Sequence, residues 1–141
     1  MIDKHRLRRL LAPKSIAVFG SRGADFAIRE SLAMGFTGPI WSIHPKRCEL
    51  MGIKCLKSAL ALPQAPDAAY VAVNAQSAIE TVAQLNNIGA GGAILYASGF
   101  SEIGGELNPE LSRIGAKRQA LLLEAAGDMP IIGPNCYGVI N

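Results

Sequence analysis

The strongest constraint on the fold of this chain is an alternation of apolar runs with segments of helical spacing. The apolar runs have the length of buried strands and cover residues 15–19, 39–43, 67–73, 91–98 and 129–133. The helical patterns cover residues 25–36, 75–89 and 107–127, and residues 49–63 indicate a short excursion with one helical turn. Strands that alternate with helices over short connections are typical of a parallel sheet with helices on both faces.

We therefore predict an α/β fold, a Rossmann-like doubly wound parallel sheet of about five strands, as a single domain over residues 1–141. Asn108 and Pro109 are placed as the N-cap and first residue of the last helix, and Ser77 and Glu80 have the spacing of a capping box. The apolar face expected for the helix over residues 25–36 carries Phe26, Ile28, Leu32 and Ala33.

Composition excludes several classes of protein. Half of the 141 residues are hydrophobic and 18% are charged, which argues against disorder. No apolar run approaches the roughly 20 residues of a membrane helix, and the basic N-terminus lacks the apolar stretch of a secretory signal. We expect a cytoplasmic domain with no membrane partner.

The charge of the chain and its cysteines restrict the classes of ligand that we expect. The three cysteines form no CxxC pair, so we expect neither a disulfide framework nor a metal site. The net charge of +3 is too mild to indicate nucleic acid. A basic cluster within residues 4–14 is interpreted as the solvated face of a short helix.

The loops after the strands are the candidate sites, because ligands of such sheets bind at the carboxyl ends of the strands. Gly20-Ser21-Arg22-Gly23 follows the first strand and leads into a helix, where glycine and the helix N-terminus favour an anion. The spacing is GxxG rather than the dinucleotide fingerprint GxGxxG, and a plain turn explains it equally well.

The second strand ends in "HPKR" rather than in the acidic residue that binds a ribose in NAD domains. Lys46 and Arg47 favour a ribose that carries a phosphate, as in coenzyme A or NADP, with surface charges as the alternative. His44 is interpreted as a loop residue rather than a ligand.

Two later loops carry small polar residues. Residues 96–106 supply backbone amides, Ser98 and Ser101, although a structural turn is an equal competitor. In "GPNCYG", Asn135 can bridge two loops, whereas Cys136 has no histidine near it in sequence to activate its thiol.

Five segments together resemble the coenzyme A-binding domain of NDP-forming acyl-CoA synthetases, a group that includes the alpha subunit of succinyl-CoA synthetase and ADP-forming acetate–CoA ligases. The segments are "KSIAVFGSR", "GPIWSIHPKR", "MGIKCLKSALALPQAPDAAYVAV", "GAILYASGFSEIGGE" and "IIGPNCYGVIN". They occur in the order of that family and run from about residue 10 to residue 141.

The resemblance implies that coenzyme A lies across the carboxyl ends of the strands. It assigns the phosphate end to Gly20, Ser21, Arg22 and Gly23, and a phosphate contact to Lys46 or Arg47. It places Val73, Asn74 and Ala75 on one wall, Tyr96, Ala97 and Ser98 on the next, and Asn135 and Cys136 near the reacting end.

The resemblance also implies a role within a larger enzyme. Such ligases use a phosphohistidine in a second domain and an ATP-grasp module, and neither His5 nor His44 matches that histidine. We therefore expect the N-terminal part of a longer ligase that positions the thiol without catalytic residues of its own. The first loop is shorter than in relatives, and Asn74 replaces a proline.

The residues themselves are compatible with two other functions. A dehydrogenase module that binds NADP would share the cationic second loop but should carry a full glycine fingerprint. A regulatory domain that binds no nucleotide is compatible with the shortened first loop.

Overall fold

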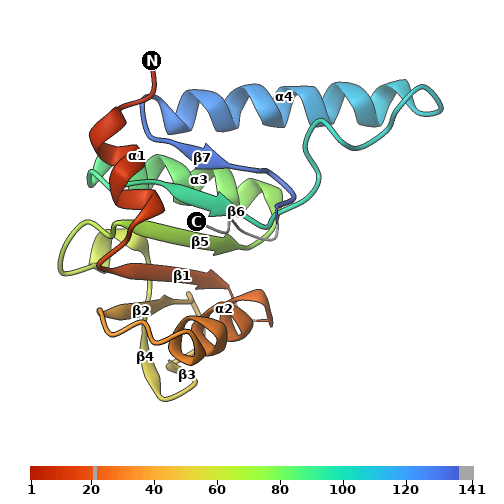
Figure 1. Cartoon of the computed structure of the whole chain (residues 1–141). Helices are drawn as coiled ribbons and strands as arrows, with labels where there is room; N and C mark the ends of the chain where they lie inside the picture. The colour runs from red at the N-terminus through yellow and green to blue at the C-terminus, as the bar shows by residue number, and fades with distance from the viewer. Residues whose placement is uncertain (21, 137–141) are drawn as a thin grey trace.

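The computed structural model describes residues 1–20 and 22–136, and its strands form one sheet in the order β3-β4-β2-β1-β5-β6-β7 (Figure 1). The strands are β1 (Ile16–Gly20), β2 (Ile40–Ile43), β3 (Glu49–Leu50), β4 (Ile53–Leu56), β5 (Ala68–Ala72), β6 (Ala93–Leu95) and β7 (Ile131–Ile132). The helices are α1 (Lys4–Leu11), α2 (Arg22–Ala33), α3 (Ala75–Asn87) and α4 (Pro109–Ala126), with a 3-10 turn, η1, at Ala59–Ala61.

The order of the strands creates a switch point beside β1. After β1 the chain moves outward through β2 and β4, and it then crosses back to place β5 on the other side of β1. The connections after β1 and β5 therefore leave the sheet in opposite directions. A crevice forms where they separate, and ligands of open parallel sheets bind in such crevices.

Helices cover both faces of the sheet, as predicted. On one face, α2 buries Ala24 and Ile28 in a cluster with Val18. On the other face, α3 and α4 pack in a larger cluster that includes Phe19 and Leu122. The doubly wound α/β class is confirmed.

The apolar face predicted for α2 is confirmed at Ile28, which is buried, and wrong at its other three residues. Phe26 and Leu32 are 53% and 54% exposed, and Ala33 is also exposed. The helix begins at Arg22, earlier than the expected residue 25, and it turns Ala24 and Ile28, four residues apart, toward the sheet.

The capping box expected at Ser77 and Glu80 is also wrong. The N-cap of α3 is Asn74, whose side-chain oxygen accepts a hydrogen bond from the Ser77 amide at 2.9 Å. A residue at N3 donates its backbone N–H to the cap and cannot be the cap itself. Asn74, which the resemblance marked as a departure, thus starts the helix. The cap at Asn108 with Pro109 behind it is confirmed for α4.

Two short strands were missed. β3 and β4 form an antiparallel hairpin that extends the sheet beyond β2 to seven strands, two more than the predicted number of about five. Met51 and Gly52 at its turn both have positive φ, 51° and 77°. Asn-Gly is the usual sequence signal for such a turn, and methionine gives none.

The basic cluster near the N-terminus is partly structural, which corrects the solvated face expected for it. Arg6 donates to the carbonyl oxygens of Asn86 and Ala90, and Arg9 pairs with Asp67 at 2.7 Å. These contacts fix α1 beside the start of β5. Lys4, Arg8 and Lys14 are exposed.

Within the described ranges, no helix is both long enough and apolar enough to cross a bilayer.

Candidate functional site

Two adjoining cavities lie at the carboxyl ends of the central strands. Cavity 1 has a volume of about 410 Å³ and lies between the ends of β1, β2 and β5. Cavity 2 has a volume of about 540 Å³ and lies between the ends of β5 and β6. Ala72, Val73 and Asn74 line both cavities, so the crevice at the switch point continues from one into the other.

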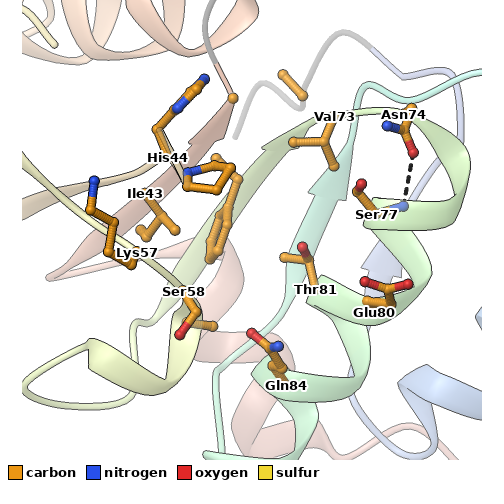
Figure 2. A pocket seen from close by; sticks show the side chains of 15 residues that line it. Ile43, His44, Lys57, Ser58, Val73, Asn74, Ser77, Glu80, Thr81 and Gln84 are labelled. Atoms are coloured by element: carbon orange, nitrogen blue, oxygen red, sulfur yellow. Dashed lines mark hydrogen bonds between the residues drawn. The ribbon is translucent and has the colours of Figure 1, made fainter. Parts of the chain in front are cut away.

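Cavity 1 has one cationic wall and one neutral or acidic wall. Figure 2 shows His44 and Lys57 on one side, and side chains of α3 on the other. The α3 wall is formed by Ser77, Glu80, Thr81 and Gln84. This arrangement offers charge at one side and hydrogen-bonding groups at the other, which suits a polar anionic ligand.

His44 organises the loop that follows β2. Its Nδ1 atom accepts hydrogen bonds from the backbone N–H groups of Lys46 and Arg47 at 3.1 and 3.0 Å. Desolvation and the nearby charges of Arg47, Lys57 and Lys46 lower the pKa of His44 below 6.5. The imidazole is therefore neutral at pH 7, and the positive charge belongs to its neighbours.

Lys57, the residue that follows β4, reinforces that loop. Its Nζ atom donates to the Arg47 carbonyl oxygen at 3.3 Å, and its side chain lines cavity 1. An ammonium group with three donors that uses one of them on the backbone can offer the others to a ligand.

Glycines bring backbone close together at the switch point. A Cβ on Gly20 would overlap the carbonyl oxygen of Ala72, and a Cβ on Gly23 would lie 2.8 Å from the Ala72 Cβ. The start of α2 is thereby packed against β5. Gly20 itself lines cavity 1.

Cavity 2 is formed by the start of α3, the residues after β6 and one side chain of α4. Its lining includes Ala75, Gln76, Tyr96, Ala97, Ser98 and Arg118. The Arg118 guanidinium donates from Nη1 to the Gly99 carbonyl oxygen at 3.0 Å. This contact connects α4 to the loop that follows β6.

The loop after β7 joins the same end of the sheet. The Asn135 amide donates to Ala97 at 2.8 Å, and the Cys136 amide donates to Leu95 at 3.0 Å. Burial raises the pKa of Tyr70, and Tyr96 and Cys136 nearby add to that rise. These interactions place Asn135 and Cys136 beside the strand that leads into cavity 2.

Seven of the fourteen predicted site residues line the two cavities. Gly20 lines cavity 1, Val73 and Asn74 line both cavities, and Ala75, Tyr96, Ala97 and Ser98 line cavity 2. Arg22 is exposed at the start of α2, and Lys46 and Arg47 are exposed on the loop after β2. These three lie outside the linings of both cavities. Ser21 lies outside the described residues.

Several residues that line the two cavities were not predicted from the sequence. Lys57 and Ser58 fall in the excursion interpreted without strands, and Arg118 lies within a helix far from any strand end in sequence. Ser77, Glu80, Thr81 and Gln84 recur along one side of α3. Their three- and four-residue spacing is the one signal that could have indicated a shared polar face.

Comparison with known proteins identifies the family to which this chain belongs. The model of a family described as "CoA binding domain" matches residues 14–141. The chain belongs to the CoA-binding domain family. The family description and the ligases among the relatives confirm coenzyme A as the cofactor expected from the sequence.

Relatives of this CoA-binding domain are much longer than the chain. It is 37% identical to trans-feruloyl-CoA synthase FCS1 from an unknown prokaryotic organism, over 99% of this chain and 20% of that protein. It is 34% identical to the ADP-forming acetate–CoA ligase of Methanocaldococcus jannaschii, over 97% of this chain and 19% of that protein. The chain thus spans about a fifth of the length of these curated relatives.

A solved structure agrees with the fold. The CoA-binding domain superposes on the apo form of dinucleotide forming acetyl-coenzyme A synthetase 1 from Candidatus Korarchaeum cryptofilum with a TM-score of 0.79. The two chains are 29% identical over 94% of this chain and 28% of that one.

The described residues fit coenzyme A in shape and charge. The two cavities share three lining residues, and each has a volume inside the usual range of about 300–1,000 Å³ for ligand pockets. Lys57 supplies a cation to the lining of cavity 1, and Arg118 supplies one to cavity 2 beside Tyr96, Ala97 and Ser98. These cations suit a ligand that carries phosphate groups, as coenzyme A does.

Proposed function

We propose that this chain is the coenzyme A-binding part of a longer ADP-forming acyl-CoA synthetase, in which it positions the CoA thiol to receive an acyl group from an acyl phosphate. The observation that carries the proposal is the pair of cavities that share Ala72, Val73 and Asn74 at the switch point. The names of the relatives support the reaction class, since they include ADP-forming acetate–CoA ligases.

The nucleotide end is assigned to cavity 1. Lys57, Lys46 and Arg47 would pair with phosphate, and Gly20 would allow close approach of the backbone. Ser21, Arg22 and Gly23 remain assigned to the same phosphate end on the strength of the sequence motif. The polar wall of α3 would face the base and ribose.

The arm of coenzyme A is assigned to cavity 2, between the walls formed by Val73–Ala75 and Tyr96–Ser98. Asn135 and Cys136 would lie near the reacting end, as their bonds to Ala97 and Leu95 suggest. Coenzyme A supplies the nucleophilic thiol when bound. The residues of this chain contribute by fixing its position, and a reactant held in place lowers the entropic part of the barrier.

The remaining chemistry is assigned to other domains or subunits. We propose a second ligase domain with a phosphohistidine and an ATP-grasp module as partners. Support comes from relatives named as alpha subunits, such as that of acetate–CoA ligase II from Pyrococcus furiosus, of which this chain covers 28%. We assign the protein to the cytoplasm, where thiols such as those of Cys48 and Cys55 remain reduced.

Calorimetric titration of the purified chain with CoA, dephospho-CoA, NADP and NAD tests the proposal. We expect heat from CoA, a weaker signal without the 3′-phosphate, and little from either dinucleotide. A preference for NADP would favour a dehydrogenase module, and silence with all four ligands would favour a domain that binds no nucleotide. The double variant Lys46→Ala/Arg47→Ala should lose about 1–3 kcal/mol of CoA binding if both residues contact phosphate.

A further inference from the structure

Arg118 places an incompletely satisfied cation in cavity 2. Among the described residues, the Gly99 carbonyl oxygen is the one hydrogen-bond partner of its guanidinium, bound by Nη1 at 3.0 Å. Arginine has five N–H donors in a rigid fork, so Nε and Nη2 remain available. The side chain is half-buried, which makes it a stronger electrostatic partner than a surface arginine.

Carboxylates near this cation do not neutralise it. The lining of cavity 2 contains Arg118 and no Asp or Glu among the described residues. Glu102, in the same loop as Gly99, uses its two carboxylate oxygens to accept the backbone N–H groups of Gly99 and Phe100. Within residues 1–20 and 22–136, Arg118 has no ion pair.

The backbone around Arg118 is shaped to hold it there. Gly99 has φ of 97°, and a Cβ at this position would lie 3.2 Å from Nη1. A larger residue would therefore crowd the guanidinium. The glycine turns the carbonyl toward Arg118 and leaves room for the group beside the cavity.

Other residues that carry hydrogen-bond donors line the same cavity. Ser98 contributes a hydroxyl, and Ala75 and Gln76 begin α3, where the first amides have no acceptor within the helix. A guanidinium, a hydroxyl and helix-terminal amides together match an anion with several oxygens. A phosphoryl group has this form and binds arginine through paired hydrogen bonds.

We propose that cavity 2 binds the phosphoryl group of the acyl phosphate, and that Arg118 holds its oxygens. This inference rests on the proposed function, which assigns the thiol end of coenzyme A to the same cavity. The acyl donor would then be oriented by this chain as well as by its partners. Free inorganic phosphate shares the recognised chemistry and is the other possible occupant.

The test uses amide chemical shifts of the full 141-residue chain at constant ionic strength. Acetyl phosphate, inorganic phosphate and acetate are titrated separately, first without and then with saturating CoA. We expect saturable shifts at Ala75, Gln76 and Ser98 with both phosphoryl compounds and none with acetate. Tighter binding of acetyl phosphate would identify the acyl phosphate as the ligand, and tighter binding of inorganic phosphate would overturn that assignment.

Variants of α4 separate Arg118 from general effects of charge. Arg118→Gln should weaken phosphoryl binding at least tenfold, and Arg118→Lys should restore part of it because the cation is kept. Arg113→Gln is the matched control, since Arg113 is 82% exposed on the same helix and should change nothing. An unaltered spectrum outside cavity 2 confirms that each variant is folded.

The outcomes distinguish this inference from the proposed function. Absence of phosphoryl binding, or equal binding by the wild type and Arg118→Gln, would overturn the role of Arg118 even if CoA binds. Failure of CoA to bind, with phosphoryl shifts that still depend on Arg118, would overturn the proposed function and leave the anion site.

Discussion

Gly20 and Ala72 are paired across β1 and β5, and a Cβ on Gly20 would overlap the Ala72 carbonyl oxygen. The two strands thus approach at the floor of cavity 1 in a way that a glycine permits. Gly20 also has φ of 116°, a region that L side chains rarely adopt.

Gly20→Ala should therefore destabilise the fold by about 2–3 kcal/mol, measured by urea unfolding. The matched control is Gly52→Ala at the β3–β4 turn, where φ is 77° and the space is open. That variant should cost about 1 kcal/mol, from backbone conformation alone. Equal losses in the two variants would contradict a steric role for Gly20.

Lys57→Ala should weaken CoA binding about fivefold at low salt, equivalent to about 1 kcal/mol, because an exposed cation contributes modestly. Lys54→Ala is the control, since Lys54 is exposed on β4, three residues before Lys57, and lies outside both cavities. The difference between the two variants should shrink as salt screens the charge. Calorimetry that gives the same affinity for both would exclude Lys57 from the phosphate end.

The pKa of His44 depends on the positive charges around the loop that follows β2. Desolvation and the charges of Arg47, Lys57 and Lys46 lower its pKa, so NMR should give a midpoint below 6.5. Lys57→Ala should move that midpoint upward, because one repulsive charge is removed. A midpoint that does not move would show that Lys57 does not face the imidazole.

The same shift predicts how the loop responds to pH. Because the folded-state pKa lies below that of the unfolded chain, the contribution of His44 to stability is present above pH 6.5. It is lost as pH falls through the folded-state pKa, since protonation of Nδ1 would remove the acceptor for the Lys46 and Arg47 amides. His44→Asn keeps an acceptor and should remove this pH dependence.

Asp67 makes a second contribution that depends on pH. Burial opposes its ionisation, but hydrogen bonds from Arg9 and the Lys14 amide outweigh burial and lower the pKa of Asp67 below 3.8. Its stabilisation is therefore present above pH 3.8 and lost as pH falls through the folded-state pKa. Asp67→Asn should cost about 2 kcal/mol at pH 7 and much less at pH 2, as measured by urea unfolding. An equal cost at both pH values would contradict the pairing with Arg9.

The sequence predicts the parallel core of this fold because strands buried on both faces leave continuous apolar runs. Strands β2, β5, β6 and β7 fall within the predicted runs, and β1 extends one residue beyond its run, to Gly20. The hairpin of β3 and β4 has short strands and a Met-Gly turn, so neither length nor turn chemistry revealed it. The cap at Asn74 was missed because Ser77 and Glu80 have the same local spacing as a true capping box.

The site was predictable where it follows strand ends in the chain. The loop at residues 96–106 was found because parallel strands bring their carboxyl ends together, whereas the resemblance to the family assigned Val73 and Asn74 to the site. Lys57 follows the unpredicted strand β4, and Arg118 lies in a helix packed across the sheet. The positions of Lys57 and Arg118 at the crevice depend on tertiary packing, which cannot be inferred from the positions of the predicted strand ends.

Amide chemical-shift mapping with coenzyme A tests the central assignment most directly. We expect saturable shifts in both cavities on one titration, at Gly20 and Lys57 in cavity 1, at Asn74, which lines both, and at Ser98 in cavity 2. Shifts confined to surfaces away from the carboxyl ends of the strands, or saturation that leaves both cavities unperturbed, would contradict it.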